Sequence, residues 1–298
     1  MKRVTAKVRQ DLQAYAQLYE CREFIHGDPS WFMHQVKGER NQETMAFIAS
    51  CLSYGSRTVF MPRIQFLLDS AHGEPYEWIS TGAFQRDIPD DSACFYRLYT
   101  NRMMLDFFQA LREMLLEYGS LRNYIEAFVH RKYAVENCLT TENRQQISEI
   151  HAIDAIESLC SYFSDRQIKG IVPQNTQSCC KRVCMFLRWM VRNSSPVDLG
   201  IWADFIDKKS LIIPLDTHVL NQGLRLGLIE GKSVSMVVAR RLTDKLLRIF
   251  PDDPLRGDFA LFGYGINTKQ AFFFHERSSK FLLIISSKSS LSLCRINK

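Results

Sequence analysis

The chain has 298 residues, of which 46% are hydrophobic, 23% charged and 12% aromatic. This composition is sufficient for a sizeable core and excludes a disordered chain, while fourteen glycines and nine prolines exclude collagen-like and low-complexity architectures. The longest apolar runs contain only a few residues and the chain begins with polar residues, so we expect no membrane span, no signal peptide and a cytoplasmic location.

The net charge of +6 is unevenly distributed along the chain. Residues 275–298 hold five basic residues and one acidic residue, which leaves a net charge of only +2 for the rest. Overall charge is therefore weak support for a nucleic-acid partner, and any basic surface on the body of the protein must be local.

The nine cysteines include no Cys-x-x-Cys pair, the usual signature of a zinc ribbon or a ferredoxin-type cluster. We therefore expect no iron–sulfur cluster, no bound metal and no cofactor. Cys179, Cys180 and Cys184 are close together in the sequence, and buried thiols in a reducing cytosol are the simplest interpretation.

Apolar residues recur with helical period through most of the chain, and period-two alternation is rare. In chain order, these patterns predict helices over residues 45–52, 60–68, 104–115, 153–163, 183–190, 219–226 and 234–249. Pro251 ends the last of them, and Asp253 with Pro254 predicts the start of another helix.

We therefore predict an all-α protein of about ten helices. The polar, apolar-poor stretch around residues 138–146 suggests a boundary between an N-terminal helical subdomain, 1–149, and a C-terminal one, 150–267. A basic, serine-rich tail over 268–298 is expected to be poorly ordered.

Residues 181–192 concentrate positive charge on one predicted helix. Its apolar face, at i, i+3, i+4 and i+7, consists of Val183, Phe186, Leu187 and Met190. The other side presents, at i, i+4, i+7 and i+11, Lys181, Met185, Arg188 and Arg192. With Arg182 nearby and no acidic residue, such a stripe can follow a phosphate backbone, although spacing alone favours a solvated helix face.

Lys181 and Asp216 stand at the starts of two predicted helices. The helix dipole and Arg182 disfavour the protonated form of Lys181, which would lower its pKa and let the amine act as a nucleophile; an ordinary surface lysine is the alternative. Asp216 follows the apolar segment 211–215 and is placed to cap the next helix. It is either only a cap, or a cap whose second oxygen faces a cleft beside a lysine.

The segment 214–219, Pro-Leu-Asp-Thr-His-Val, resembles the Val-Asp-Thr-His segment of the helix-hairpin-helix DNA glycosylase superfamily. The resemblance implies that Asp216 is catalytic and that Lys181, 35 residues earlier, is the Schiff-base nucleophile of a glycosylase that also cleaves the strand. The length of this interval is closest to the archaeal 8-oxoguanine glycosylase branch.

Further motifs carry a more specific resemblance. Residues 20–266 are similar to a bacterial family of uncharacterised proteins distantly related to those archaeal enzymes. The shared motifs include Tyr54-Gly55, Phe95-Tyr96-Arg97, the segment 180–192 and the segment 259–263.

Three departures from the superfamily pattern stand out. No glycine occurs between Gly170 and Gly200, so the glycine hairpin that holds a phosphate is missing or rebuilt from residues 173–178. Tyr54-Gly55-Ser56 stands where endonuclease III-like members carry Gln-Gln-Thr, which implies a different base readout. The four-cysteine iron–sulfur loop is absent.

The resemblance implies a glycosylase-like fold with a cleft between the two subdomains. It also implies a function in base-excision repair, on duplex DNA that carries a damaged base. An oxidised purine is the favoured damaged base. In this interpretation Lys181 and Asp216 are catalytic. The base would be contacted by Met185, Trp189, Tyr54 and Asp258. The DNA backbone would be bound by Arg182, Arg188 and Arg192. We expect a monomer that associates with the nucleoid when bound to DNA and has no membrane partner.

Two other functions remain open. One is a catalytically inactive, helical nucleic-acid-binding or scaffold protein of the same fold, which the missing glycine hairpin favours. The other is a glycosylase that acts through Asp216 without a covalent lysine. The sequence leaves the lesion, and the choice between DNA and RNA, undecided.

Overall fold

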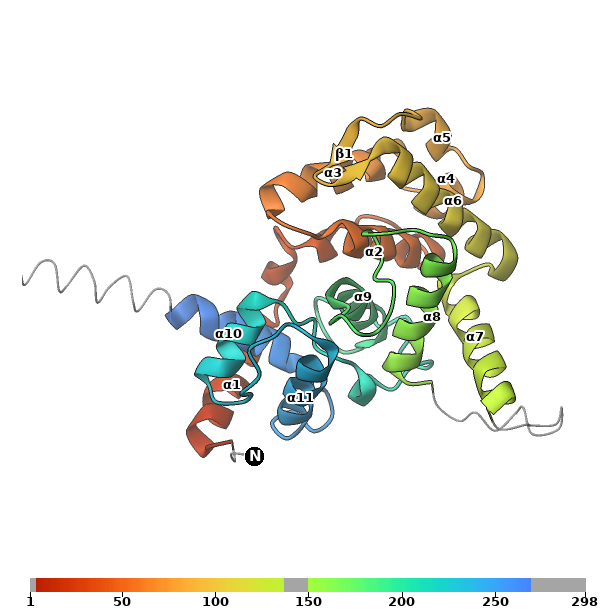
Figure 1. Cartoon of the computed structure of the whole chain (residues 1–298). Helices are drawn as coiled ribbons and strands as arrows, with labels where there is room; N and C mark the ends of the chain where they lie inside the picture. The colour runs from red at the N-terminus through yellow and green to blue at the C-terminus, as the bar shows by residue number, and fades with distance from the viewer. Residues whose placement is uncertain (1–3, 137–149, 269–298) are drawn as a thin grey trace, which may run out of the picture.

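The computed structural model describes residues 4–136 and 150–268, and this part of the chain is mostly helical, which confirms the predicted all-α class (Figure 1). Before residue 137 the elements are α1 (Ala6–Tyr19), η1 (Arg22–Ile25), η2 (Pro29–His34), α2 (Glu39–Leu52), α3 (Arg57–Ser70), α4 (Pro75–Ser80), α5 (Phe84–Asp87), β1 (Cys94–Tyr96), β2 (Tyr99–Thr100), α6 (Asn101–Tyr118) and α7 (Leu121–Glu136). After residue 149 they are α8 (Ala152–Asp165), α9 (Lys181–Val191), η4 (Lys208–Ser210), α10 (Thr217–Arg225), α11 (Met236–Leu247) and a helix over 256–268.

Helix α2 lies at the centre of the core, and α9 packs beside it (Figure 1). Residues 43–52 of α2 are buried on every side, as expected for a helix without a solvent face. The ring of Phe47 contacts one aromatic ring from each of three other helices, with centroids 5.2–6.1 Å apart: Phe107 of α6, Phe163 of α8 and Phe186 of α9. This cluster fixes the position of α9, the helix that carries Lys181.

The predicted helices correspond to observed ones, with some differences at their ends. In α6 the predicted apolar stripe is buried, Thr100 caps the first turn, and Gly119 ends the helix in the left-handed conformation. The expectation that Asp253 caps the last described helix is wrong, because that helix begins at residue 256 and the Asp253 carboxylate binds Arg192 instead.

The hairpin formed by β1 and β2 was not predicted. Its two short strands are antiparallel and are joined through Arg97 and Leu98, with Arg97 at a φ of 51°. No glycine or asparagine marks this turn, so the usual sequence signal of a hairpin is missing. Packing holds it, since Phe95 of β1 lies against Phe66 of α3.

The first helix packs against the last described one. The rings of Tyr19 and Phe262 are 5.8 Å apart, and the Glu20 carboxylate accepts hydrogen bonds from Arg192 and Arg256. The predicted division at residue 149 assigns α1 and these packing partners to different subdomains, although they contact each other.

Two regions of the sequence analysis fall wholly or mostly outside the described residues. These are the proposed boundary, within 137–149, and all but the first residue of the 268–298 tail. Within 4–136 and 150–268, none of the helices is both long and apolar enough to cross a membrane.

Candidate active site

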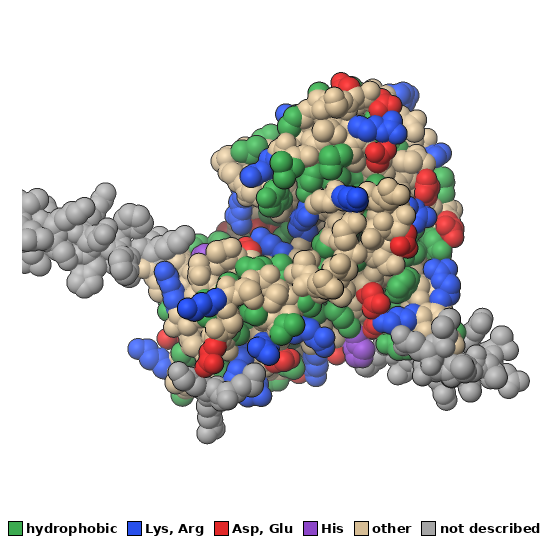
Figure 2. Space-filling model, viewed as in Figure 1, with side chains coloured by type: hydrophobic (Ala, Val, Ile, Leu, Met, Phe, Trp, Pro, Cys, Tyr) green, Lys and Arg blue, Asp and Glu red, His purple; other side chains and the backbone are tan. Residues whose placement is uncertain are grey.

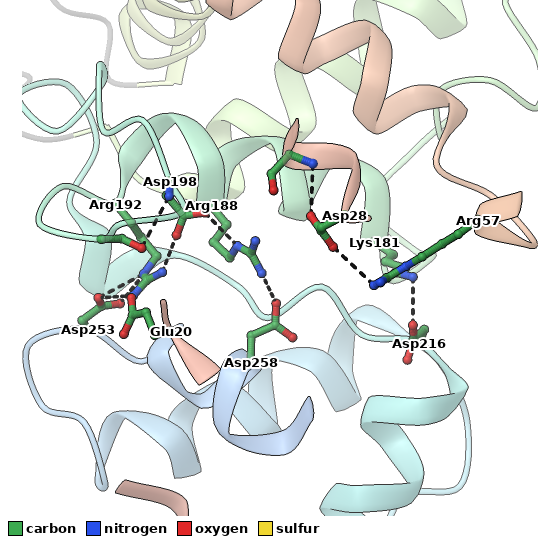
Figure 3. Close-up of polar contacts among 12 residues, drawn as sticks. Glu20, Asp28, Arg57, Lys181, Arg188, Arg192, Asp198, Asp216, Asp253 and Asp258 are labelled. Atoms are coloured by element: carbon green, nitrogen blue, oxygen red, sulfur yellow. Dashed lines mark hydrogen bonds and ion pairs between the residues drawn. The ribbon is translucent and has the colours of Figure 1, made fainter. Parts of the chain in front are cut away.

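Lys181 and Asp216 form an ion pair between two helix starts. Lys181 is the first residue of α9, and its Nζ donates a hydrogen bond to Oδ2 of Asp216 at 2.8 Å (Figure 3). The other oxygen of Asp216, Oδ1, accepts from the backbone N–H of Val219 at 2.8 Å and caps α10. The predicted cap is confirmed, and its second oxygen is the one that meets the lysine.

The Asp216 carboxylate is held in its charged form. Burial by itself would raise the pKa of Asp216, but the Lys181 ammonium, together with the hydrogen bonds from Lys181 and Val219, lowers that pKa below its ordinary value. The site therefore pairs a fixed anion with a primary amine.

This ion pair lies on the wall of a pocket of about 790 Å³, within the size range of small-molecule sites. The pocket is lined by residues from the end of α2, the starts of α3, α9 and α10, and the helix over 256–268. The lining includes the side chains of Tyr54, Arg57, Lys181, Met185, Asp216 and Asp258. A second pocket of about 640 Å³ lies between α6 and the segment after α8 and includes none of the predicted site residues.

Asp258 approaches the same pocket from the helix over 256–268. Arg188 Nη1 donates to Asp258 Oδ2 at 2.5 Å, while Oδ1 accepts no hydrogen bond from the described residues (Figure 3). Burial raises the pKa of Asp258 and outweighs the opposing effect of Arg188. Asp258 is thus a carboxyl group at the pocket whose Oδ1 accepts no hydrogen bond from the described residues and could accept one from a ligand.

Arg188 and Arg192, which were predicted to bind the DNA backbone, lie inside the protein. They are only 4% and 1% exposed, and both donate to Asp198 (Figure 3). Arg192 also makes a two-pronged contact with Asp253. Asp198 and carboxylates from distant parts of the chain surround and neutralise both guanidinium groups, and of the two only Arg188 contributes to the pocket lining.

The other predicted contacts are divided between the pocket and the core. Trp189, which was predicted to contact the base, is fully buried and is not among the residues that line the pocket. Met185 and the exposed Tyr54 do line the pocket. Arg182 also lines it, but its guanidinium donates to Cys51 O, the Tyr99 hydroxyl and Gly170 O, and so ties the start of α9 to α2 and the hairpin.

Two contacts near the pocket were not predicted from the sequence. Arg57 donates to Asp28 at 3.3 Å across the pocket lining, and the Arg97 guanidinium lies 4.8 Å from the Tyr54 ring centroid. Phe95-Tyr96-Arg97 and Tyr54-Gly55 had been noted only as motifs. Nothing in either motif showed that they meet.

Cys180 precedes Lys181 in the left-handed conformation, and its Sγ lies 4.0 Å from that of Cys160. The neighbouring Cys160 thiol lowers the pKa of Cys180 below its ordinary value. These cysteines are free thiols.

Among residues 4–136 and 150–268, no group of three or more His, Cys, Asp or Glu side chains is arranged to hold a metal ion.

Over residues 28–267 the sequence matches a protein family described as being of unknown function, DUF2400. No curated protein and no solved structure matches the chain.

Proposed function

We propose that this chain, which belongs to the DUF2400 family of proteins of unknown function, is a DNA N-glycosylase that removes a damaged base and can also cleave the strand. The observation that carries the proposal is the 2.8 Å contact between Lys181 Nζ and Asp216 Oδ2 at the wall of a pocket of about 790 Å³. A primary amine beside a fixed carboxylate is the pairing that imine chemistry at a sugar requires.

The proposal includes a glycosylase-like fold in which this pocket is the cleft between two helical layers. In that arrangement α2 and α3 form one wall, α10 and the helix over 256–268 form the other, and α9 lies between them. Supporting this view, the pocket lining comes from all of these elements.

The chemistry begins with a damaged nucleotide turned out of the duplex into the pocket. Lys181, as a neutral amine, attacks C1′ while Asp216 stabilises the positive charge that develops on the sugar. The bond from the amine to C1′ forms, the bond from C1′ to the base breaks, and the base leaves with a proton. The C1′–O4′ bond then breaks, O4′ takes a proton, and an iminium forms between C1′ and the lysine nitrogen. This iminium acidifies the C2′ proton, whose removal expels the 3′ phosphate and cleaves the strand.

Asp258, Met185 and Tyr54 would hold the base. The uncommitted Oδ1 of Asp258 is available to a base N–H, while Met185 and Tyr54 offer apolar surface at the same pocket. Arg188 would act as a positioning residue, because it fixes Asp258 through Oδ2. An oxidised purine remains the favoured substrate, on the resemblance alone.

A second candidate is a nucleic-acid-binding or scaffold protein without chemistry. The burial of Arg188 and Arg192, together with the missing glycine hairpin, favours the scaffold protein in particular, because two predicted sources of phosphate contact are lost. A third candidate, hydrolysis through Asp216 without a covalent lysine, uses the same carboxylate.

Borohydride trapping separates the three. With duplexes carrying 8-oxoguanine or other damaged bases, the wild-type protein should form a reduced covalent adduct, and Lys181→Gln should form none, because an amide cannot form the imine. Lys37→Gln, an exposed lysine before α2, is the matched control and should be trapped like the wild type.

The other results assign the alternatives. Base release without any adduct would indicate hydrolysis through Asp216. An adduct with Lys181→Gln would point to another amine, and neither release nor adduct with any lesion would support the protein without chemistry.

A further inference from the structure

Helix α3 and the tip of the β1–β2 hairpin form an exposed surface that the chemistry above does not use. We call it the α3–hairpin surface and define it by six of the exposed side chains on these elements: Arg57, Val59, Arg63, Phe66, Arg97 and Leu98. Its apolar members are unusually open for large hydrophobic residues: Val59 is 51%, Phe66 40% and Leu98 77% exposed. Figure 2 shows hydrophobic side chains, with Lys or Arg among them, over α3 and β1. Exposed apolar surface of this kind commonly marks a binding site.

The charge of this surface is mainly positive. Besides the three arginines, α3 carries one exposed carboxylate, Asp69 in its last turn, which accepts a hydrogen bond from Gln65. Of the arginines, only Arg57 has a carboxylate partner among the described residues, Asp28. The Arg63 guanidinium lies 5.7 Å from the Phe95 ring centroid, and that of Arg97 lies 4.8 Å from the Tyr54 centroid. An arginine that stacks on a ring keeps N–H donors free for oxyanions such as phosphates.

Leu98 stands at the hairpin turn, beside the strained Arg97 with its φ of 51°. A non-glycine residue held in the left-handed region at a turn is one of the marks of a functional site. The turn is fixed against the pocket: the Tyr96 hydroxyl donates to Tyr54 O, and a Cβ on Gly55 would meet Arg97 Nη1 at 2.2 Å. Since Tyr54 and Gly55 line the pocket, the turn lies at its rim.

We propose that the α3–hairpin surface binds the DNA duplex beside the pocket, with its arginines on phosphates and Leu98 entering the base stack. The inference rests on the proposed function, because a nucleotide turned into the pocket leaves a gap in the duplex. An apolar side chain that fills such a gap is removed from water and replaces lost stacking. The excess of positive charge favours a polyanion over a neutral apolar partner.

The test measures binding of the full-length protein to a duplex that contains a tetrahydrofuran abasic-site analogue, by fluorescence anisotropy over a range of salt concentrations. Arg63→Gln should reduce the slope of log K against log salt by about one unit. Leu98→Ala should leave the slope unchanged and weaken binding about tenfold, as expected for withdrawing most of a leucine from a buried site.

Two matched controls lie away from this surface. Arg131 on α7 is also exposed and rests on an aromatic ring, 6.0 Å from the Tyr118 centroid, so Arg131→Gln should bind like the wild type. Leu116 on α6 is 59% exposed, and Leu116→Ala should likewise have no effect. Because all four residues are exposed, circular dichroism melting should show wild-type folding.

Base release, measured in parallel, distinguishes a failure of the surface assignment from a failure of the proposed function. If the wild type releases a damaged base while Arg63→Gln and Leu98→Ala bind like their controls, the surface assignment is overturned and the proposed function stands. If the wild type neither binds the duplex nor releases any base, both fail. Loss of binding to phosphatidylserine vesicles in Leu98→Ala, with DNA binding unchanged, would assign the surface to a membrane and overturn the proposal.

Discussion

Arg188, on the same helix as the candidate nucleophile Lys181, holds the carboxylate of Asp258 at 2.5 Å. The two residues are 70 positions apart in the sequence, and their contact joins α9 to the helix over 256–268. Through it, one helix supplies the amine and also positions a carboxyl group of the pocket. The buried cations of α9 thus organise the site from inside the protein.

Arg188→Ala should destabilise the protein strongly. The change leaves the Asp198 and Asp258 carboxylates without one of their cationic partners in a buried environment, and breaking a buried pair in this way costs about 3–5 kcal/mol. Urea unfolding checks the value. Arg240→Ala, at an exposed position on α11, should change stability by less than about 0.5 kcal/mol. A similar small effect for Arg188→Ala would contradict the structural role assigned to this ion pair.

Asp216→Asn should slow borohydride trapping by about two orders of magnitude or more, because the site loses the anion that stabilises the developing sugar cation. The fold should survive, since asparagine caps a helix about as well as aspartate. Thermal unfolding measures the second point. Asp207→Asn, the same change at the cap of η4, is the control and should be trapped at the wild-type rate. Equal rates for both variants would remove Asp216 from the chemistry.

Glu43 should make stability depend on pH. Burial raises the pKa of Glu43 to about 7, against the hydrogen bonds that it accepts from Leu121 N, Arg122 N and Trp202 Nε1. The folded state therefore binds the proton more tightly than the unfolded state, whose glutamate has the ordinary pKa of about 4.5.

The free energy of unfolding should consequently fall as pH rises from about 4.5 to about 7, by up to roughly 3 kcal/mol from this group. Chemical denaturation at a series of pH values measures the decline. Glu43→Gln removes the titrating group and should flatten the curve over that window. An equally steep decline in the variant would assign it to other groups.

Gly263→Ala should destabilise the contact between α1 and the last described helix. A Cβ at this position would meet ring carbons of Tyr19 at 2.3 and 2.6 Å, so the ring or the helix must move. Overpacking of this kind costs about 1–3 kcal/mol. In a Tyr19→Ser background, which removes the ring, the cost of Gly263→Ala should largely disappear in denaturant unfolding. An undiminished cost in the double variant would show that the strain lies elsewhere.

The sequence by itself determined most of the longer helices and the starts of α9 and α10. The apolar stripes of α6 and α8 and the cap at Asp216 depend on residues within one or two turns of each other, and such short-range patterns are visible in one sequence. The order of Lys181 and Asp216, together with the resemblance, was enough to predict that they belong to one site, and the ion pair agrees with this.

Only the tertiary structure decided which side of α9 meets water. Helical period placed Arg188 and Arg192 opposite the apolar face, but Glu20, Asp253 and Asp258, from 61 to 172 residues away, cover them. It also decided that Arg97, on an unpredicted hairpin, rests on Tyr54 at the pocket rim. The physical reason is that periodicity assigns a residue to a face of its own helix, whereas burial and charge pairing depend on what the rest of the chain brings to that face.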